Sequence, residues 1–242
     1  MITSTANEKI KAAASLKEKK FRDLTGLYLI EGERLVRQAL QSGIPLKEIY
    51  VTDAVANADF LGAELVTQAV LNKLADTVTP QGVVAVAARP SSEFVLPEGN
   101  GIILDGVSAP DNVGAVIRTA AALGYGDVYL RGCADAYAPK AVRASMGGIF
   151  YARTREVTYE QLCDIKKSGV EIIGADMAGE PLRCRGPSEK FAVVIGGEAF
   201  GISEDVRGLC SGFVSIPIAQ IESLNAAVSA GIIMYALKNS ND

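Results

Sequence analysis

The alternation of short apolar strands with helical segments through residues 101–242 restricts the fold of this chain more than any other feature. Strands are predicted at 101–107, 127–132, 170–176, 191–197 and 213–217, and helices at 112–124, 138–148 and 224–237. Apolar strands of this length between helices are typical of a mostly parallel sheet with helices on both faces. We therefore expect residues 101–242 to form an α/β domain.

The N-terminal part repeats this alternation on a smaller scale. Strands are predicted at 26–32, 46–52 and 82–88, and helices at 32–42 and 65–76. The next segment combines Ser, Pro and Gly between two apolar runs, which is typical of a linker. The expected organisation is a small α/β domain at 1–90, a linker at 91–100 and the parallel α/β domain at 101–242.

The composition excludes several kinds of active site. There is no histidine, which rules out Ser/His/Asp and Cys/His nucleophile systems and any zinc site with an imidazole ligand. No C-x-x-C pair occurs among the cysteines, which are Cys133, Cys163, Cys184 and Cys210. We interpret them as reduced packing residues. Hydrolytic functions are therefore disfavoured, and no metal site is expected.

Hydropathy gives no sign of a membrane. No apolar run approaches the roughly 18 residues that a membrane span requires. The N-terminal segment carries Lys and Glu where a secretory signal peptide needs an apolar core. We therefore expect a cytoplasmic protein.

Charge is unevenly distributed along the chain. The 24 Lys and Arg against 28 Asp and Glu give a net charge of −4, so bulk electrostatics do not favour nucleic acid. A basic cluster near the N-terminus favours it locally, in a stretch whose composition is typical of helix. It comprises Lys9, Lys11, Lys17, Lys19, Lys20 and Arg22. The alternative interpretation is a solvated helix face.

Two common nucleotide-binding motifs are absent. A dinucleotide site requires G-x-G-x-x-G after the first strand of the sheet, whereas the loop there reads LDGVSAPDNVGAVIRT. A later GYGDVY has Tyr129 where the third glycine belongs. There is no P-loop lysine motif either. An NAD-dependent oxidoreductase is therefore disfavoured.

Three other loops lie at the carboxyl ends of predicted strands, where α/β sheets bind ligands. They read SAPDNVGAVIRT at 108–119, IGGEAFGIS at 195–203 and IPIAQIESLNAAVS at 216–229. Each alone has a structural explanation, since Asp111 or Asn112 could cap one helix and Ser223 another. The occurrence of all three in this order favours a functional explanation.

These loops resemble the motifs of the SpoU, or TrmH-like, branch of the SPOUT RNA methyltransferases, which methylate ribose 2′-hydroxyls. The first loop matches the first motif with Asn112 and Arg118, the second has Glu198, and the third has Ser223 and Asn225. APKAVRASMGGIF also matches a family segment, and residues 1–90 resemble the substrate-binding domain of many members. The resemblance covers the whole chain.

The resemblance implies a deep trefoil knot in the C-terminal sheet, S-adenosylmethionine as cofactor and a homodimer. Carried over to this sequence, the expected cofactor-binding residues are Gly196, Gly197, Ile216, Ile218, Leu224 and Asn225. The apolar side chains suit the adenine ring, whose edge would pair with main-chain amides. We expect the dimer to form through the last helix, because its small residues Ala226, Ala227, Ala230 and Gly231 permit close approach.

The chain departs from the family pattern at two places. Ala109-Pro110 stands where many members have Asp-Pro, which puts a capping or loop-fixing contact in doubt. GGEAFG stands where many have GNEGKG, so Ala199 and Phe200 change the surface near the target base.

For catalysis, the resemblance implies that Asn112, Arg118, Glu198, Ser223 and Asn225 act on the target ribose. Methyl transfer needs in-line attack by the hydroxyl oxygen, so positioning should supply most of the rate. An arginine is a poor base because its pKa exceeds about 12. We therefore assign Arg118 first to orienting ribose and phosphate, and only secondly to proton removal.

RNA contact is expected at the N-terminal cluster and at a second basic group, Arg131, Lys140, Arg143, Arg153 and Arg155. Ribosomal RNA is preferred over transfer RNA, because the appended N-terminal domain is commoner among members that modify ribosomal RNA. The alternatives are a transfer-RNA ribose methyltransferase and a catalytically inactive RNA-binding assembly factor with the same fold.

Overall fold

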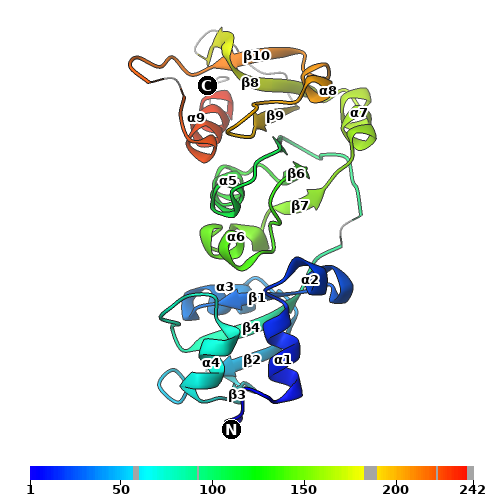
Figure 1. Cartoon of the computed structure of the whole chain (residues 1–242). Helices are drawn as coiled ribbons and strands as arrows, with labels where there is room; N and C mark the ends of the chain where they lie inside the picture. Colours follow the sequence, from blue (N-terminus) through cyan, green and yellow to red (C-terminus); the bar gives the residue numbers. More distant parts are fainter. Residues whose placement is uncertain (57–59, 92, 183–189, 222, 239–242) are drawn as a thin grey trace.

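The computed structural model describes residues 1–56, 60–91, 93–182, 190–221 and 223–238, and it divides into an N-terminal and a C-terminal part, each with its own sheet (Figure 1). In this view the N-terminal part lies at the bottom. The C-terminal part lies above it, and both sheets have helices on either side. The two-part α/β organisation predicted from the periodicity is confirmed.

The N-terminal sheet has the strand order β1-β4-β2-β3. Its strands are β1 (Leu27–Glu31), β2 (Leu46–Val51), β3 (Glu64–Leu65) and β4 (Val83–Ala88), and the helices are α1 (Glu8–Ser15), α2 (Lys19–Thr25), α3 (Glu33–Gln41) and α4 (Gln68–Leu74). β4 pairs antiparallel with both neighbours. Alternate residues of β4 point to opposite faces, so Val84 and Val86 pack under α1 and α4, while Val83 and Ala85 pack under α3.

The C-terminal sheet is parallel throughout, with the order β10-β8-β9-β5-β6-β7. Its strands are β5 (Gly101–Asp105), β6 (Asp127–Arg131), β7 (Arg153–Glu156), β8 (Glu171–Pro181), β9 (Phe191–Gly196) and β10 (Gly212–Ser215). The helices are α5 (Pro110–Leu123), α6 (Pro139–Ala144), the 3₁₀ helix η2 (Gly148–Phe150), α7 (Tyr159–Lys167), α8 (Glu204–Arg207) and α9 (Ala226–Lys238). The predicted parallel sheet is confirmed, whereas β7, α7 and α8 were not predicted. The trefoil knot stays a prediction.

Two helical layers cover this sheet. α5 and α9 pack on one face, while α7 and α8 pack on the other (Figure 1). α6 crosses α5 at Gly114, where a Cβ would lie 2.3 Å from the carbonyl oxygen of Ala141. Only glycine permits so close an approach, and it sets α6 between the two parts of the molecule.

The two parts are joined by a buried ion pair and an aromatic contact. The Arg22 Nη2 atom lies 2.6 Å from Asp135 Oδ2, and their side chains are only 3% and 7% exposed. The same guanidinium donates to the carbonyl oxygens of Leu16 and Lys17 at 2.7 Å. Arg22 was predicted to contact RNA, but its donors are turned inward and it holds α2 against the C-terminal part instead.

Tyr28 and Tyr137 continue this junction, with ring centroids 5.0 Å apart in an edge-to-face arrangement. Buried side chains of β1 and α3 belong to the same apolar cluster as those of β5 and α5. The junction is therefore a packed core and not a loose linker contact.

Part of the predicted small face of the last helix is used within the chain itself. Ala226 and Ala230 are buried, and a Cβ on Gly231 would lie 3.6 Å from the Thr119 side chain on α5. Ala227 and Gly231 are only partly buried, so a subunit contact through this helix stays a prediction. The exposed apolar side chains of α9 are Val228, Ile232 and Tyr235, which follow one another at helical spacing.

Three cysteines have the packing role expected of them, since Cys133, Cys163 and Cys210 are free thiols of intermediate exposure. Burial raises the pKa of Cys133 and raises that of Cys210 to about 11, which keeps both protonated. Cys184 lies outside the described residues. None of the helices described is long and apolar enough to cross a membrane.

Candidate active site at the ends of the parallel strands

The candidate site begins where β5 and β9 end side by side. Asp105 pairs with Gly196 in the parallel register, and the Gly197 amide donates to the Asp105 carbonyl oxygen at 2.8 Å. A Cβ on Gly197 would lie 2.3 Å from the Gly106 carbonyl oxygen. The loops after the two strands therefore leave the sheet in direct contact, which requires glycine at Gly197.

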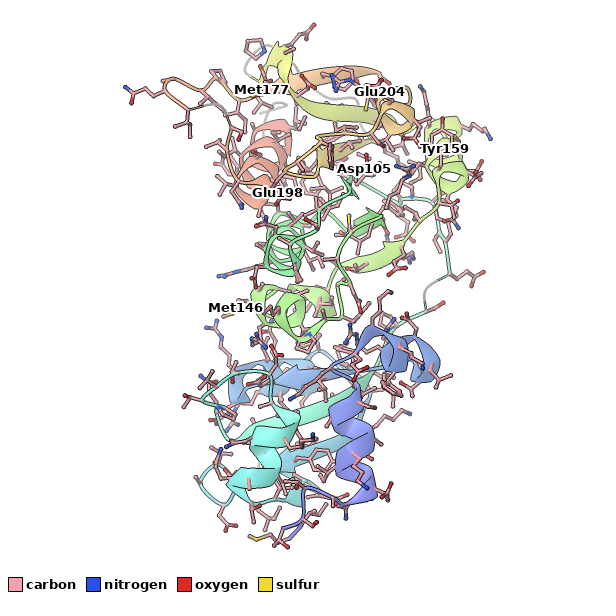
Figure 2. All side chains as sticks on the ribbon, in the orientation of Figure 1. Asp105, Met146, Tyr159, Met177, Glu198 and Glu204 are labelled. Atoms are coloured by element: carbon pink, nitrogen blue, oxygen red, sulfur yellow. The ribbon has the colours of Figure 1, made fainter. Side chains whose placement is uncertain are left out.

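One hydrogen-bonded chain links the three predicted motifs. Asn112 donates through Nδ2 to the Glu198 carboxylate, and its Oδ1 accepts from Asn225 Nδ2 at 2.9 Å. The Asn225 Oδ1 atom accepts from the amides of Ala227 and Val228 at 3.0 and 3.3 Å. Figure 2 shows Glu198 next to α9 and above α5, where these segments meet. Three of the five predicted catalytic residues are thus in one network.

The residues that cap α5 and α9 are not those that the sequence suggested. Neither Asp111 nor Asn112 caps α5, because Ala109 occupies the cap position and makes no side-chain hydrogen bond. Asn225 caps α9 in place of Ser223. The side chain of Asn112 is therefore free of helix capping and holds the two other motifs.

Arg118 and Ser223 lie outside this network. Arg118 is six residues beyond Asn112 on α5, which places it about 9 Å along the axis and on another side of the helix. It is exposed and has no hydrogen-bond or ion-pair partner in the part of the chain that the structure describes. Ser223 is exposed and lines the adjacent cavity.

That cavity contains the predicted apolar cofactor residues. Ile216, Ile218 and Leu224 line a space of about 110 Å³ together with Ser223 and Met177. The backbone N–H groups of these three apolar residues have no acceptor among the described residues. An apolar wall beside unused amides can hold a flat heteroaromatic ring and bond its edge.

The predicted cofactor-binding glycines, Gly196 and Gly197, lie at the end of β9, on the same edge of the sheet as this cavity. Gly196 ends β9, which is separated from β10 only by β8, so about 10 Å lies between the two loops. Gly197 faces a second hollow of about 620 Å³. A ligand of nucleoside length can span from the glycines to the apolar cavity.

Most of the predicted RNA-binding lysines near the N-terminus pair with nearby acceptors. Lys9 pairs with Glu64, Lys11 with Glu8, and Lys19 with Asp23 and Glu156. Lys17 donates to the Ala75 carbonyl oxygen, and Lys20 lies over the Phe21 ring. The predicted helix is also broken between α1 and α2, so these residues do not share one helix face.

The second basic group is largely engaged within the protein. Arg131 binds Asp105 and Asp205, Arg143 binds Asp76, and both Arg153 and Arg155 bind Asp127, with N···O distances of 2.5 to 3.1 Å. Arg155 is also buried, so it has a structural role in place of the predicted RNA contact. Lys140 is exposed and has no hydrogen-bond or ion-pair partner among the described residues.

Sequence reasoning missed one polar cluster beside the site. Asp105 Oδ2 accepts from the Ser203 amide at 2.7 Å and from its hydroxyl at 2.6 Å. Arg131 binds the same carboxylate and the same hydroxyl. The cluster fixes the loop that carries Glu198. Its only sequence signal was the position of Asp105 at the end of a strand.

No group of three or more His, Cys, Asp or Glu side chains within the described ranges is placed to hold a metal ion. The hydrogen-bonded chain supplies the Asn112 and Asn225 amides and the Glu198 carboxylate, and the Ser223 hydroxyl lines the adjacent cavity. Such a set can orient a hydroxyl and a phosphate.

Comparison with known proteins places this chain in a recognised family. Residues 100–235 match the SpoU rRNA Methylase family, and residues 7–85 match the MRM3-like substrate binding domain. The chain belongs to the SpoU rRNA Methylase family.

Individual relatives are similar to this chain over nearly its full length. The chain is 33% identical to the 23S rRNA (guanosine(2553)-2′-O)-methyltransferase RlmP of Bacillus subtilis, with 98% of each chain covered. A crystal structure of an RNA 2′-O ribose methyltransferase has 33% identity and a TM-score of 0.85, covering 99% of this chain and 98% of the other. The SpoU methyltransferase AviRb from Streptomyces viridochromogenes, in complex with AdoMet, has 26% identity and a TM-score of 0.87, covering 97% and 98%.

Proposed function

We propose that this protein is an S-adenosylmethionine-dependent methyltransferase that methylates a ribose 2′-hydroxyl in ribosomal RNA. The observation that carries the proposal is the hydrogen-bonded chain from Glu198 through Asn112 to Asn225. It brings together three loops that are far apart in sequence. The family membership and the 2′-O-methyltransferase activity of the Bacillus subtilis relative support the same reaction.

The residues present fit the cofactor. Ile216, Ile218 and Leu224 would enclose the adenine, and their unused amides would bond its edge. Gly196 and Gly197 would lie beside the remainder of the molecule. The bound cofactor supplies the methyl group on a sulfonium, and no charged clamp is needed to hold it.

The residues of this chain would position the hydroxyl that accepts the methyl group. Asn112 has both of its side-chain groups engaged, so it is held in one orientation beside Glu198. Ser223 lines the cofactor cavity and can donate to the ribose. Arg118 would bind the substrate phosphate and ribose, since its guanidinium has no described partner of its own.

A cofactor-binding test follows from the apolar cavity. Leu224→Asp should weaken S-adenosylmethionine binding at least about tenfold, because a carboxylate would be placed against the adenine without a partner. Ile221→Asp is the matched control, since Ile221 is 62% exposed on the same loop. Calorimetric titration of both variants measures the difference. Equal affinities would remove this cavity from the cofactor site.

We also propose that the protein acts in the cytoplasm as a homodimer, with 1–90 as the RNA-binding domain, 91–100 as the linker and 101–242 as the catalytic domain. The two family matches, at 7–85 and 100–235, support this division. The exposed stripe Val228, Ile232 and Tyr235 on α9 supports a dimer contact through the C-terminal helix.

The dimer has its own test. Ile232→Asp should shift the protein to monomer in sedimentation at micromolar concentration, because burying the new carboxylate would cost several kcal/mol. Leu24→Asp, at an exposed apolar position on α2, should leave the oligomeric state unchanged. A wild-type protein that sediments as a monomer would contradict the dimer.

Mapping of ribose methylation tests the proposed function in cells. Total RNA from cells with and without the gene should differ by one or a few 2′-O-methyl sites in ribosomal RNA. A lost site in transfer RNA would support the transfer-RNA alternative. Identical maps would support the alternative of an inactive assembly factor. No feature of the Glu198–Asn112–Asn225 network favours that alternative.

A further inference from the structure

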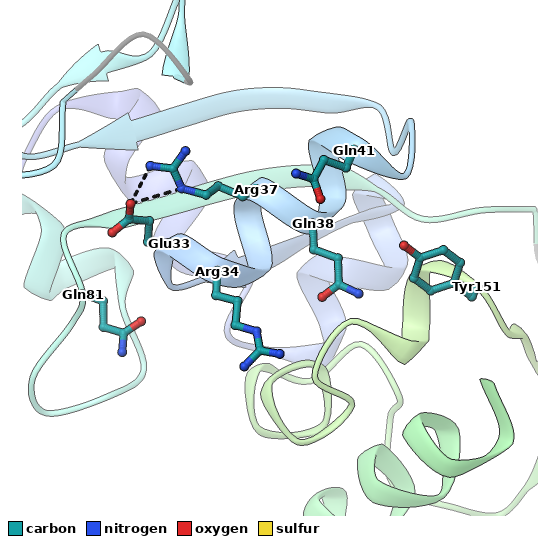
Figure 3. A pocket seen from close by; sticks show the side chains of 7 residues that line it. All are labelled: Glu33, Arg34, Arg37, Gln38, Gln41, Gln81 and Tyr151. Atoms are coloured by element: carbon teal, nitrogen blue, oxygen red, sulfur yellow. Dashed lines mark hydrogen bonds and ion pairs between the residues drawn. The ribbon is translucent and has the colours of Figure 1, made fainter. Parts of the chain in front are cut away.

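A polar groove lies at the junction of the two parts, away from the strand ends described above. It has a volume of about 790 Å³ and runs along α3 (Figure 3). Its lining includes Arg34, Arg37, Gln38, Gln41, Gln81 and Tyr151. We call this cavity the α3 groove. Arg34 and Gln81 also line an adjoining hollow of about 370 Å³ that reaches Arg143 and Met146 on α6 and its end.

The α3 groove has one uncompensated positive charge. Arg37 binds Glu33 at 2.6 Å, and Arg143 binds Asp76 at 2.9 Å. Arg34 is exposed and has no carboxylate partner among the described residues. Arg34 is therefore the guanidinium in this groove that can bind an incoming phosphate without first breaking an ion pair.

The other side chains of the α3 groove suit nucleotide bases. Gln38, Gln41 and Gln81 carry amides that both donate and accept. The Tyr151 ring is 60% exposed, and its hydroxyl accepts from Ser42 Oγ at 2.9 Å, which restrains the ring. An aromatic platform beside a cation and amides is the composition with which proteins hold single-stranded RNA. A protein partner would require a more apolar centre.

The α3 groove connects directly to Arg118. A Cβ on Gly147 would lie 2.2 Å from the Gln38 side chain, so this turn touches α3. A Cβ on the next residue, Gly148, would lie 2.7 Å from the Arg118 Cα atom, so the same turn touches α5. Two consecutive glycines thus separate the groove from Arg118. In Figure 2, Met146 and Glu198 lie on the same side of the molecule.

We propose that the α3 groove binds the single-stranded RNA segment next to the target nucleotide, with Arg34 on a phosphate and Tyr151 stacked on a base. This inference rests on the proposed function, because it names where the substrate of that site continues. It also moves the RNA-binding surface of the N-terminal part from the lysines of α1 and α2 to α3.

The test uses the full chain and unmethylated large-subunit ribosomal RNA transcribed in vitro. RNA affinity is measured at several salt concentrations for the wild type, Arg34→Glu, Tyr151→Ala and Tyr151→Phe. Lys73→Glu is the matched charge reversal, since Lys73 is exposed on α4, which covers the opposite face of the N-terminal sheet from α3. S-adenosylmethionine affinity and methyl incorporation are measured in parallel.

Arg34→Glu should weaken RNA binding at least about tenfold, the effect of losing a hydrogen bond to a charged group. It should also lower the salt slope by about 0.7, the value for one phosphate contact on a single strand. Tyr151→Ala should weaken binding by about five- to a hundredfold through lost stacking, and Tyr151→Phe should restore it. Cofactor affinity should be unchanged in every variant.

The outcomes separate this inference from the proposed function. In one outcome the wild type methylates the RNA, but Arg34→Glu and Tyr151→Ala bind RNA as tightly as Lys73→Glu does. This result would overturn the role of the α3 groove and leave the proposed function standing. In another outcome Arg34→Glu weakens RNA binding, but the wild type does not methylate the RNA. This result would overturn the proposed function and leave the role of the α3 groove standing. A wild type that neither binds nor methylates the RNA would overturn both.

Discussion

Arg118→Ala should lower the rate of methyl transfer at least about a hundredfold, while S-adenosylmethionine binding stays within a few-fold of wild type. Positioning and charge stabilisation by one group commonly contribute this much. Arg118 does not line the proposed cofactor cavity, which is why cofactor binding should survive. The side chain is also exposed, so its removal leaves the packing of α5 intact.

Two further variants make this result specific. Arg118→Lys should recover little activity, because an ammonium does not replace a planar, bidentate donor. Lys47→Ala, at an exposed position on β2, should be fully active. Single-turnover assays with saturating RNA measure the chemical step directly. A loss of cofactor binding in Arg118→Ala with the fold intact would contradict the division of roles proposed here.

Arg22→Ala should destabilise the protein by about 3–5 kcal/mol, because it leaves the buried Asp135 carboxylate without its cation. The two carbonyl oxygens of Leu16 and Lys17 would lose their donor as well. Urea unfolding followed by circular dichroism measures the change. Lys20→Ala, at an exposed position on the same helix, is the control and should change stability by less than about 0.5 kcal/mol.

The double variant Arg22→Met with Asp135→Leu completes this test. Replacing both partners of a buried ion pair with apolar side chains is often neutral or stabilising. The double variant should therefore recover the stability that Arg22→Ala loses through the unpaired carboxylate, but not the share due to the Leu16 and Lys17 carbonyl oxygens. An Arg22→Ala protein as stable as wild type, with weakened RNA binding, would restore the original interpretation of Arg22 as an RNA contact.

The sequence predicted the C-terminal sheet well because its central strands are apolar runs with turn residues at both ends. β7 escaped prediction because it lies at the sheet edge and reads Arg-Thr-Arg-Glu. Its two arginines look like a surface patch in the sequence. In the fold they bind Asp127 on the neighbouring strand, a pairing that only the parallel register creates.

The candidate site was predictable as a set of loops but not as a geometry. Parallel strands that end at one edge bring Asn112, Glu198 and Asn225 together, and the motifs identified all three. Sequence spacing could not show that Asn225 caps α9 in place of Ser223. It also gave no reason for Gly231 to face Thr119 on α5, because the helix is apolar on almost every side and its orientation depends on tertiary packing.

The α3 groove could not be predicted from charge counts. Lysines are dense in residues 9–20, and this density drew attention there, yet local carboxylates and carbonyls bind most of them. Arg34 is one of two arginines in an ordinary amphipathic helix. Its importance emerges only when α3 packs beside the turn that carries Gly147 and Gly148.

The most direct test of the central claim is transfer of a labelled methyl group by the purified full chain. The protein is incubated with methyl-tritiated S-adenosylmethionine and unmethylated 23S ribosomal RNA transcript, and the RNA is digested to nucleosides. We expect label in a 2′-O-methylnucleoside with the wild type and almost none with Arg118→Ala. Label on a base, or no label with a wild-type protein that binds both cofactor and RNA, would contradict it.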